Sequence, residues 1–207
     1  MFESFSIANI VVVIVSILVS LTIHEAMHAY VAHVLGDTTA KDEGRLTLNP
    51  LQHVDLLMTI GLPVVMIMVG LPPLLIAKPV PFDPHSVRFG EYGAALVALA
   101  GPFTNLGLAI VGAVIMRLVG LDGDLAGILN IFVQINIVFF VFNMIPFPPL
   151  DGSRLLYALA PEPVQRVMYA IESAGFLVII LVFLLAAPIV LPIVGNISEA
   201  IYLFLLG

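Results

Sequence analysis

Four long apolar runs constrain this 207-residue chain more than any other feature of its sequence. A helix needs about 20 mainly apolar residues to cross the hydrocarbon core of a bilayer. Runs of this kind cover residues 7–35, 92–119, 125–142 and 168–187. Apolar residues make up 61% of the chain and charged residues only 10%, more apolar surface than a water-soluble fold could bury. We therefore expect an all-α polytopic membrane protein.

Two further apolar stretches are broken by glycine and proline. Residues 56–77 contain five such breaks, and residues 193–206 follow a Pro- and Gly-containing break. Counting both, the chain has about five or six transmembrane or re-entrant segments. Between the first two of them, Arg-Leu-Thr-Leu in the stretch GRLTLNP alternates polar and apolar residues, which predicts a short membrane-associated β segment near residues 44–48.

Charge and cysteine content exclude several classes of function. Seven Lys and Arg stand against fourteen Asp and Glu, so there is no basic face for nucleic acid. The absence of cysteine excludes disulfides, thiolate metal sites and a cysteine nucleophile. No Gly-rich phosphate loop follows a strand pattern, so the sequence predicts no nucleotide partner either.

The chemistry is concentrated in the first apolar run. His24-Glu25-Ala26-Met27-His28 has the His-Glu-x-x-His pattern, in which two imidazoles one helical turn apart can reach one Zn²⁺. Glu25 lies beside them as a candidate general base. The alternative is a pair of core histidines hydrogen-bonded to neighbouring helices, but three polar groups within five residues are costly to satisfy in hydrocarbon.

A catalytic zinc needs a third protein ligand and an open position for water. His33 is five residues after His28 and points elsewhere on the helix. His53 and His85 lie in polar stretches, where we expect solvated histidines. Asp151 is the best candidate, because a carboxylate between a Pro-broken stretch and an apolar run needs a cation or several donors. Its alternative role is to cap a helix that starts near Gly152.

Three motifs in this order resemble the site-2 protease family of intramembrane zinc metalloproteases. They are HEAMH at residues 24–28, Gly101-Pro102-x-x-Asn105, and Asn143-x-x-Pro146 followed by Leu150-Asp151-Gly152. GRLTLNP and AKPVPFDP resemble the compact prokaryotic members that lack PDZ and CBS domains. The resemblance covers roughly residues 20–157.

The resemblance implies a role for each matching residue. His24, His28 and Asp151 would bind one catalytic zinc ion, and Glu25 would activate water. Asn143 and Asn105 would hold substrate or the oxyanion, although helix packing is an equal alternative for Asn105.

The resemblance also implies an organisation for the whole chain. We expect one metalloprotease domain over residues 1–207, with a three-helix catalytic core at about 7–158 and further membrane segments at about 165–207. The strand near 44–48 would present substrate. The substrate would be a transmembrane protein, cleaved in a prokaryotic cell membrane at an active site toward the cytoplasm. The sequence does not determine the oligomeric state, so a homo-oligomer remains one of the alternatives.

Two other classes of function remain as alternatives. A metal transporter could use the same side chains as a transit site, although no paired repeats with matching helix breaks are visible in the sequence. A non-catalytic membrane scaffold could keep a structural metal. Replacing Glu25 separates the three classes, because only the protease loses turnover while keeping its zinc.

The positions of the motifs also predict the topology of residues 56–77. His28 lies near the end of its apolar run, and Asp151 follows the end of the run 125–142. These ends meet only if both runs cross in the same direction, with an odd number of crossings between them. Residues 92–119 supply one crossing. We therefore expect 56–77 to be re-entrant or a hairpin, the alternative being an ordinary kinked span with Asp151 at mid-depth.

Single-cysteine labelling tests this topology, since the natural chain has no cysteine. We expect Ile60→Cys and Ile76→Cys to react with a membrane-impermeant reagent from the same side of the membrane. Labelling of the two positions from opposite sides would contradict the re-entrant segment.

Overall fold

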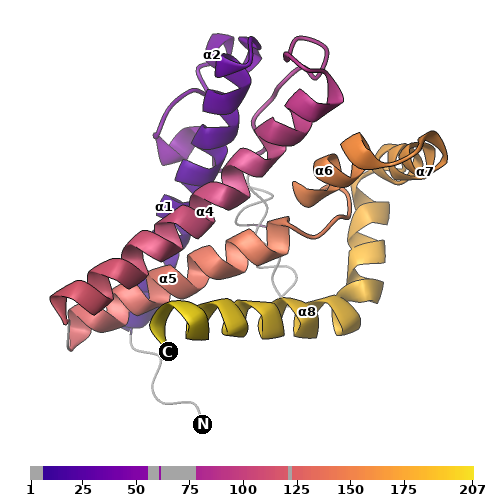
Figure 1. Ribbon diagram of the computed structural model, residues 1–207. Helices are drawn as coiled ribbons and strands as arrows, with labels where there is room; N and C mark the ends of the chain where they lie inside the picture. The colour runs from indigo at the N-terminus through magenta and orange to yellow at the C-terminus, as the bar shows by residue number, and fades with distance from the viewer. Residues whose placement is uncertain (1–6, 56–60, 62–77, 121–122) are drawn as a thin grey trace.

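The structure is a computed structural model that describes residues 7–55, 61, 78–120 and 123–207. The regular secondary structure in these ranges is all helical, as the apolar runs predict (Figure 1). The elements are α1 (Ile7–Val34), α2 (Thr39–Asp42), the 3₁₀ turn η1 (Pro50–Gln52), α4 (Glu91–Val119), α5 (Asp124–Asn143), α6 (Gly152–Leu159), α7 (Glu162–Ser173) and α8 (Phe176–Leu206).

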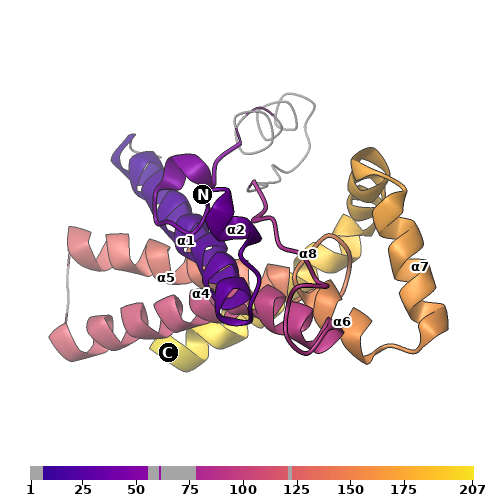
Figure 2. The same cartoon turned by 90° about the horizontal axis from the view of Figure 1, so that it is seen from above.

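Helices α1, α4 and α5 form the centre of the molecule. Figures 1 and 2 show α4 and α5 side by side and antiparallel, with α1 crossing them and in contact with both. These three helices, together with residues 181–206 of α8, are long and apolar enough to cross a membrane. Because α1 and α5 run in one direction and α4 in the other, the ends of α1 and α5 reach the same side.

Small residues let these helices approach closely. Ala29 and Ala32 of α1 are fully buried. On α4, a Cβ atom added to Gly112 would lie 2.7 Å from Val133 Cγ2 of α5, closer than a real Cβ could be. Small side chains at helix contacts are typical of membrane bundles, where van der Waals packing replaces the hydrophobic effect as a cause of association.

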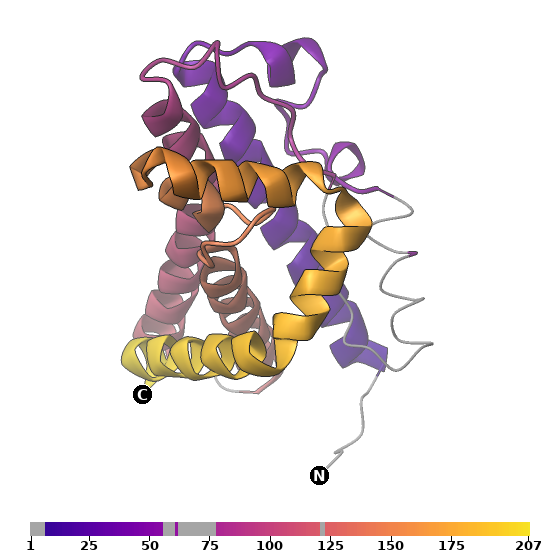
Figure 3. The same ribbon diagram turned by 90° about the vertical axis from the view of Figure 1, so that its right-hand side faces the viewer.

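The C-terminal region differs from the expected pair of apolar segments at 168–187 and 193–206. Residues 162–173 form the separate helix α7, and α8 is one continuous helix that contains Pro188 and Pro192. Figure 3 shows that α8 turns sharply along its length. A proline removes one backbone N–H and kinks a helix without necessarily ending it, which accounts for the bend.

The two ends of the connection between α1 and α4 lie next to each other. The backbone N–H of Arg88 donates to the Leu35 carbonyl at 2.9 Å, and that of Lys78 donates to the His53 carbonyl at 3.0 Å. The residues on either side of the stretch 56–77 are therefore hydrogen-bonded to each other. The stretch itself, with the expected re-entrant segment, lies outside the described residues except for Gly61.

The predicted strand near residues 44–48 is wrong, because these residues form turns and bends. Arg45 is buried and donates through Nη2 to the carbonyls of Lys78 and Pro79, at 2.7 and 3.2 Å. His53 is also buried, and its Nε2 lies 2.8 Å from the Thr47 carbonyl. Side chains therefore satisfy main-chain groups here that a strand ladder would otherwise pair.

Asp37 joins the two ends of the same connection. Its Oδ1 accepts hydrogen bonds from Thr39 N and Oγ1, at 3.0 and 2.6 Å, and its Oδ2 accepts one from Asp83 N at 3.0 Å. Burial raises the pKa of the Asp37 carboxyl, but these hydrogen bonds outweigh burial and hold the pKa below its ordinary value. The ionised carboxylate is therefore the form that stabilises the fold.

Replacing Asp37 by asparagine should destabilise the protein in a pH-dependent way. The NH₂ group of asparagine is a donor, and it would face either the donors of Thr39 or the N–H of Asp83 without forming a hydrogen bond. We expect the free energy of unfolding at pH 7 to fall by about 1–3 kcal/mol. A carboxylate with a lowered pKa stabilises above its unfolded-state pKa and loses that effect as the pH falls through the folded-state pKa. Thermal unfolding in detergent between pH 7 and 3 should therefore show a steeper loss in wild type than in D37N.

The exposed carboxylate of Asp42 provides the control, because D42N should change the unfolding temperature little. Equal unfolding temperatures for wild type and D37N at pH 7 would contradict the role given to Asp37.

Candidate metal centre and active site

Two histidines meet in the buried C-terminal half of α1. His24 and His28 are one helical turn apart, and each is less than a tenth exposed. Their Nε2 atoms lie 3.0 Å apart, and the two rings are nearly perpendicular, at 85°. Both imidazoles therefore direct the same ring nitrogen at one point.

Asp151 reaches that point from the turn after α5. Three prolines at 146, 148 and 149 prevent the helix from continuing. The turn is so tight that a Cβ atom at Gly152 would meet the main chain of Met144 and Ile145. Asp151 Oδ2 lies 3.1 Å from His24 Nε2 and 3.4 Å from His28 Nε2. Asp151 occupies the N-cap position of α6, but its side chain makes no capping hydrogen bond.

Helix α4 holds the opposite nitrogen of each ring. His24 Nδ1 lies 2.6 Å from Asn105 Oδ1, and His28 Nδ1 lies 2.7 Å from the carbonyl oxygen of Val97. An amide or carbonyl oxygen only accepts a hydrogen bond, so each Nδ1 donates. In the neutral rings, both Nε2 atoms are then left with a lone pair.

The resulting group of atoms fits a divalent cation. Two imidazole Nε2 atoms and one carboxylate oxygen, all within 4.8 Å of one another, converge with their lone pairs toward a common centre. Asp151 Oδ2 is buried and accepts no hydrogen bond. Lone pairs facing one another inside a bundle repel unless a cation shares them, and two His with one Asp suit zinc with one position open.

Two sets of residues spaced by four face each other across the contact between α1 and α4. They are Ser20, His24 and His28 on α1, and Val97, Gly101 and Asn105 on α4. Gly101 lies against the imidazole tips. A Cβ atom there would lie 2.6 Å from His24 Nε2 and closer still to His28 Nε2. Only glycine leaves both nitrogens free to share a metal ion.

Glu25 lies beside the metal-ligand cluster, and its carboxylate is held by the segment that precedes α4. It is buried, and its Oε2 accepts a hydrogen bond from the backbone N–H of Val80 at 3.2 Å. The segment that carries Val80 is itself fixed by the bonds from Arg45 to Lys78 and Pro79. The carboxylate therefore has a defined orientation beside the three candidate ligands.

A cavity of about 720 Å³ opens onto these four residues. Its walls are mostly apolar and include Leu21, Phe139, Phe142, Ile179 and Phe183. The candidate metal ligands and Glu25 form one group of polar side chains in the wall. The other polar residues of the wall are Asp55, Lys78, Asn143, Arg154 and Glu172, and the last two form an ion pair at 2.5 Å. A pocket that is largely apolar with a few convergent polar groups is the usual form of a substrate site.

The two asparagines expected at the substrate lie in different places. Asn143 lines the cavity, and its Nδ2 donates to the Phe139 carbonyl at 3.0 Å. Asn105 is fully buried behind His24, is not part of the cavity wall, and bonds Ser20 and Asn136 as well as His24. The position of Asn105 therefore matches the support of a histidine, and its predicted contact with substrate stays a prediction.

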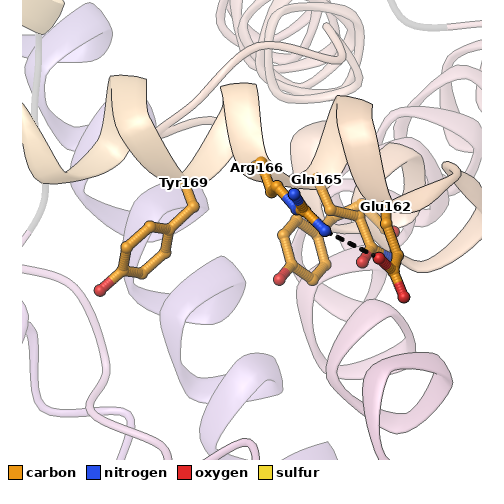
Figure 4. Close-up of a pocket in the computed structure, with 5 residues that line it drawn as sticks. Glu162, Gln165, Arg166 and Tyr169 are labelled. Carbon is orange, nitrogen blue, oxygen red and sulfur yellow. Dashed lines mark hydrogen bonds and ion pairs between the residues drawn. The ribbon is translucent and has the colours of Figure 1, made fainter.

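A second, shallow pocket of about 360 Å³ lies on α6 and α7 (Figure 4). Its charged side chains, Glu162 and Arg166, are about 80% exposed and pair with each other at 3.0 Å. An exposed pair one helical turn apart contributes little and leaves no unmatched charge. This pocket has no chemistry comparable with that of the first.

Three residues around the site received no role from the sequence motifs. Ser20 and Asn136 lie behind His24, and Val80 lies against Glu25. Polar residues inside apolar runs are costly, and this signal could have drawn attention to Ser20 and Asn136. The contact of Val80 depends on its main chain and has no signature in the side-chain sequence.

Comparison with known proteins points to one family. Residues 121–187 match the family described as "Peptidase family M50". The chain is 37% identical over 179 residues to "Putative zinc metalloprotease YwhC" of Bacillus subtilis (strain 168), covering 82% of this chain and 78% of the relative. It is 31% identical over 187 residues to "Putative zinc metalloprotease Rip2" of Mycolicibacterium smegmatis, covering 86% and 68%. No solved structure matches the chain.

Replacing Gly101 by alanine should displace the imidazoles and lower zinc affinity by at least about tenfold, since changes beside a metal ligand commonly cost 10–100-fold. The measurement is competition with a chromophoric chelator on the purified protein. Gly107 is the matched control on the same helix, because a Cβ atom there would meet nothing within 4 Å. G107A should bind zinc as wild type does, and equal affinities for G101A and wild type would contradict the cluster as a metal site.

Proposed function

This chain belongs to peptidase family M50, the site-2 protease family of zinc metalloproteases, and on that premise we propose that it cleaves transmembrane protein substrates within the membrane. One observation carries the proposal. His24, Glu25, His28 and Asp151 open together onto a mostly apolar cavity inside a bundle of helices of membrane length. An active site in that position is accessible to a substrate helix rather than to a soluble peptide.

The proposed roles follow from the geometry around each side chain. His24, His28 and Asp151 would hold one zinc ion, since their free lone pairs converge. When bound, zinc lowers the pKa of a water molecule and polarises the carbonyl of the scissile bond. Glu25 is the general base, with its carboxylate oriented by the Val80 N–H.

Glu25 would move one proton twice. It takes a proton from the attacking water as the water oxygen bonds to the scissile carbonyl carbon. When the C–N bond breaks, Glu25 gives that proton to the leaving amine. Asn143 uses one amide hydrogen on the Phe139 carbonyl and can direct the second at the oxygen of the scissile carbonyl.

The substrate must unwind before it is cut. A transmembrane helix keeps its carbonyls in internal hydrogen bonds, so the scissile bond becomes accessible only where the helix opens. The aromatic and aliphatic walls of the cavity suit apolar side chains of such a segment. Residues 78–82, which lie next to Glu25 without regular secondary structure, are the main chain that a substrate would meet there.

The proposal also includes the side of the membrane on which the active site lies. The candidate ligands lie in the C-terminal half of α1 and just after α5, toward the side on which both helices end. We assign that side to the cytoplasm of a prokaryotic cell, on the basis of the resemblance to compact prokaryotic site-2 proteases.

The conservative substitution Glu25→Gln tests the function directly. Glutamine keeps the size of the side chain but cannot accept the proton of water. We expect E25Q to retain one equivalent of zinc by elemental analysis and to lose cleavage of a model transmembrane substrate by about 10²–10⁴-fold. Zinc in both proteins with cleavage in neither, or metal flux across vesicles in wild type, would contradict a protease and support a scaffold or a transporter.

A further inference from the structure

Three buried polar side chains, two of them amides, form a hydrogen-bonded network directly behind His24. Ser20 of α1, Asn105 of α4 and Asn136 of α5 are all fully buried. Asn105 Nδ2 donates to Asn136 Oδ1 at 2.9 Å, and Asn136 Nδ2 donates to Ser20 Oγ at 2.8 Å. One polar network therefore joins all three central helices and ends on the imidazole of a candidate metal ligand.

The orientation of the Asn105 amide decides which nitrogen of His24 carries a proton. An asparagine amide has nearly the same shape when its oxygen and nitrogen exchange places. With Oδ1 toward the ring, His24 Nδ1 must donate, and Nε2 keeps its lone pair. With Nδ2 toward the ring, Nδ1 must accept, and the proton of the neutral ring moves to Nε2. That proton would point at His28 and Asp151 and block a metal.

Two main-chain carbonyls determine which orientation is adopted. The carbonyl of Phe132 lies 2.9 Å from one amide atom of Asn136, which must be Nδ2 because a carbonyl only accepts. Oδ1 of Asn136 is then the atom that faces Asn105 and requires a donor from it. The carbonyl of Ser20, 3.4 Å from Asn105 Nδ2, adds a weaker preference of the same sense.

We propose that Asn136 is a positioning residue for the metal centre: through Asn105 it fixes the proton of His24 on Nδ1 and leaves Nε2 for the metal. The inference rests on the proposed ligation of zinc by His24. His28 needs no such relay, because its Nδ1 donates directly to a main-chain carbonyl, that of Val97, which cannot turn over.

The wild-type protein gives the first test. In the metal-free protein labelled with ¹⁵N-histidine, the nitrogen shifts identify the protonated atom of the neutral ring, and comparison with His24→Gln assigns the signals. We expect neutral His24 to carry its proton on Nδ1 before zinc occupies Nε2. A proton on Nε2 would overturn the inference without any variant of Asn136.

Two substitutions in the network then separate orientation from simple packing. Asn136→Leu keeps the number and branching of the side-chain heavy atoms and removes the polarity, so the Asn105 amide can turn over. We expect zinc affinity to fall about 10–100-fold in chelator competition. Ser20→Ala removes a hydrogen bond from the same network but leaves the Phe132 carbonyl to orient Asn136. Its zinc affinity should stay within about threefold of wild type.

Asn130→Leu controls for the loss of an asparagine from α5, since Asn130 bonds Tyr202 and Gln134 away from the site. Wild-type affinity in N136L, or equal losses in N136L and S20A, would overturn the role of Asn136 while leaving the protease intact. Absence of zinc from well-folded wild type would overturn the proposed function, and this inference with it.

Discussion

Pairing of polar groups inside an apolar bundle is the constraint on which this structure depends. The polar atoms of the metal cluster that face away from its centre have partners that water would otherwise supply. The Nδ1 atoms of His24 and His28 donate to acceptors on α4, and Glu25 accepts from the main chain of Val80. The atoms left without a partner are those that converge on one another. Among the described residues, the metal cluster is the place where three ligand atoms with uncommitted lone pairs meet at one point.

The helix contacts follow from the same requirement. The imidazoles can reach acceptors on α4 only if the two backbones come close, and Gly101 permits that approach beside their tips. Asn105 extends the contact to α5 through Asn136. Packing of the three central helices and construction of the site are thus a single problem, since the hydrogen bonds from His24 to Asn105 and from Asn105 to Asn136 each join two helices.

Local patterns predicted the parts of this molecule that depend on local geometry. The one-turn spacing of His24 and His28 brings their rings to one face, and the cost of a carboxylate after an apolar run drew attention to Asp151. The helical membrane fold followed from length and hydropathy. The alternation of polar and apolar residues around Leu46 was misleading, because a run of only four residues matches a strand pattern easily. Arg45 instead donates a hydrogen bond to the Lys78 carbonyl. The apolar pattern predicted two separate segments here, whereas Pro188 and Pro192 lie within one bent helix, α8.

What sequence reasoning missed depends on contacts between distant parts of the chain. Nothing near Asn105 says whether it faces a cavity or a histidine 81 residues away. Asn136 and the main chain of Val80 act through partners that only the fold brings near. His53, which its polar surroundings suggested was solvated, is buried against Thr47. In each case the sequence identifies a polar group that needs a partner, and tertiary packing decides which partner it finds.

The facing sets of residues, at intervals of four on both α1 and α4, have a consequence for how such a chain can vary in length. One residue inserted within 20–28 or 97–105 would rotate all later positions of that helix by about 100° and move them away from the residues they face on the other helix. The connection between His53 and Lys78 has no such restriction, because these two residues are held together by a hydrogen bond whatever lies between them. Natural insertions and deletions should therefore accumulate in that connection, while the two intervals keep a fixed length.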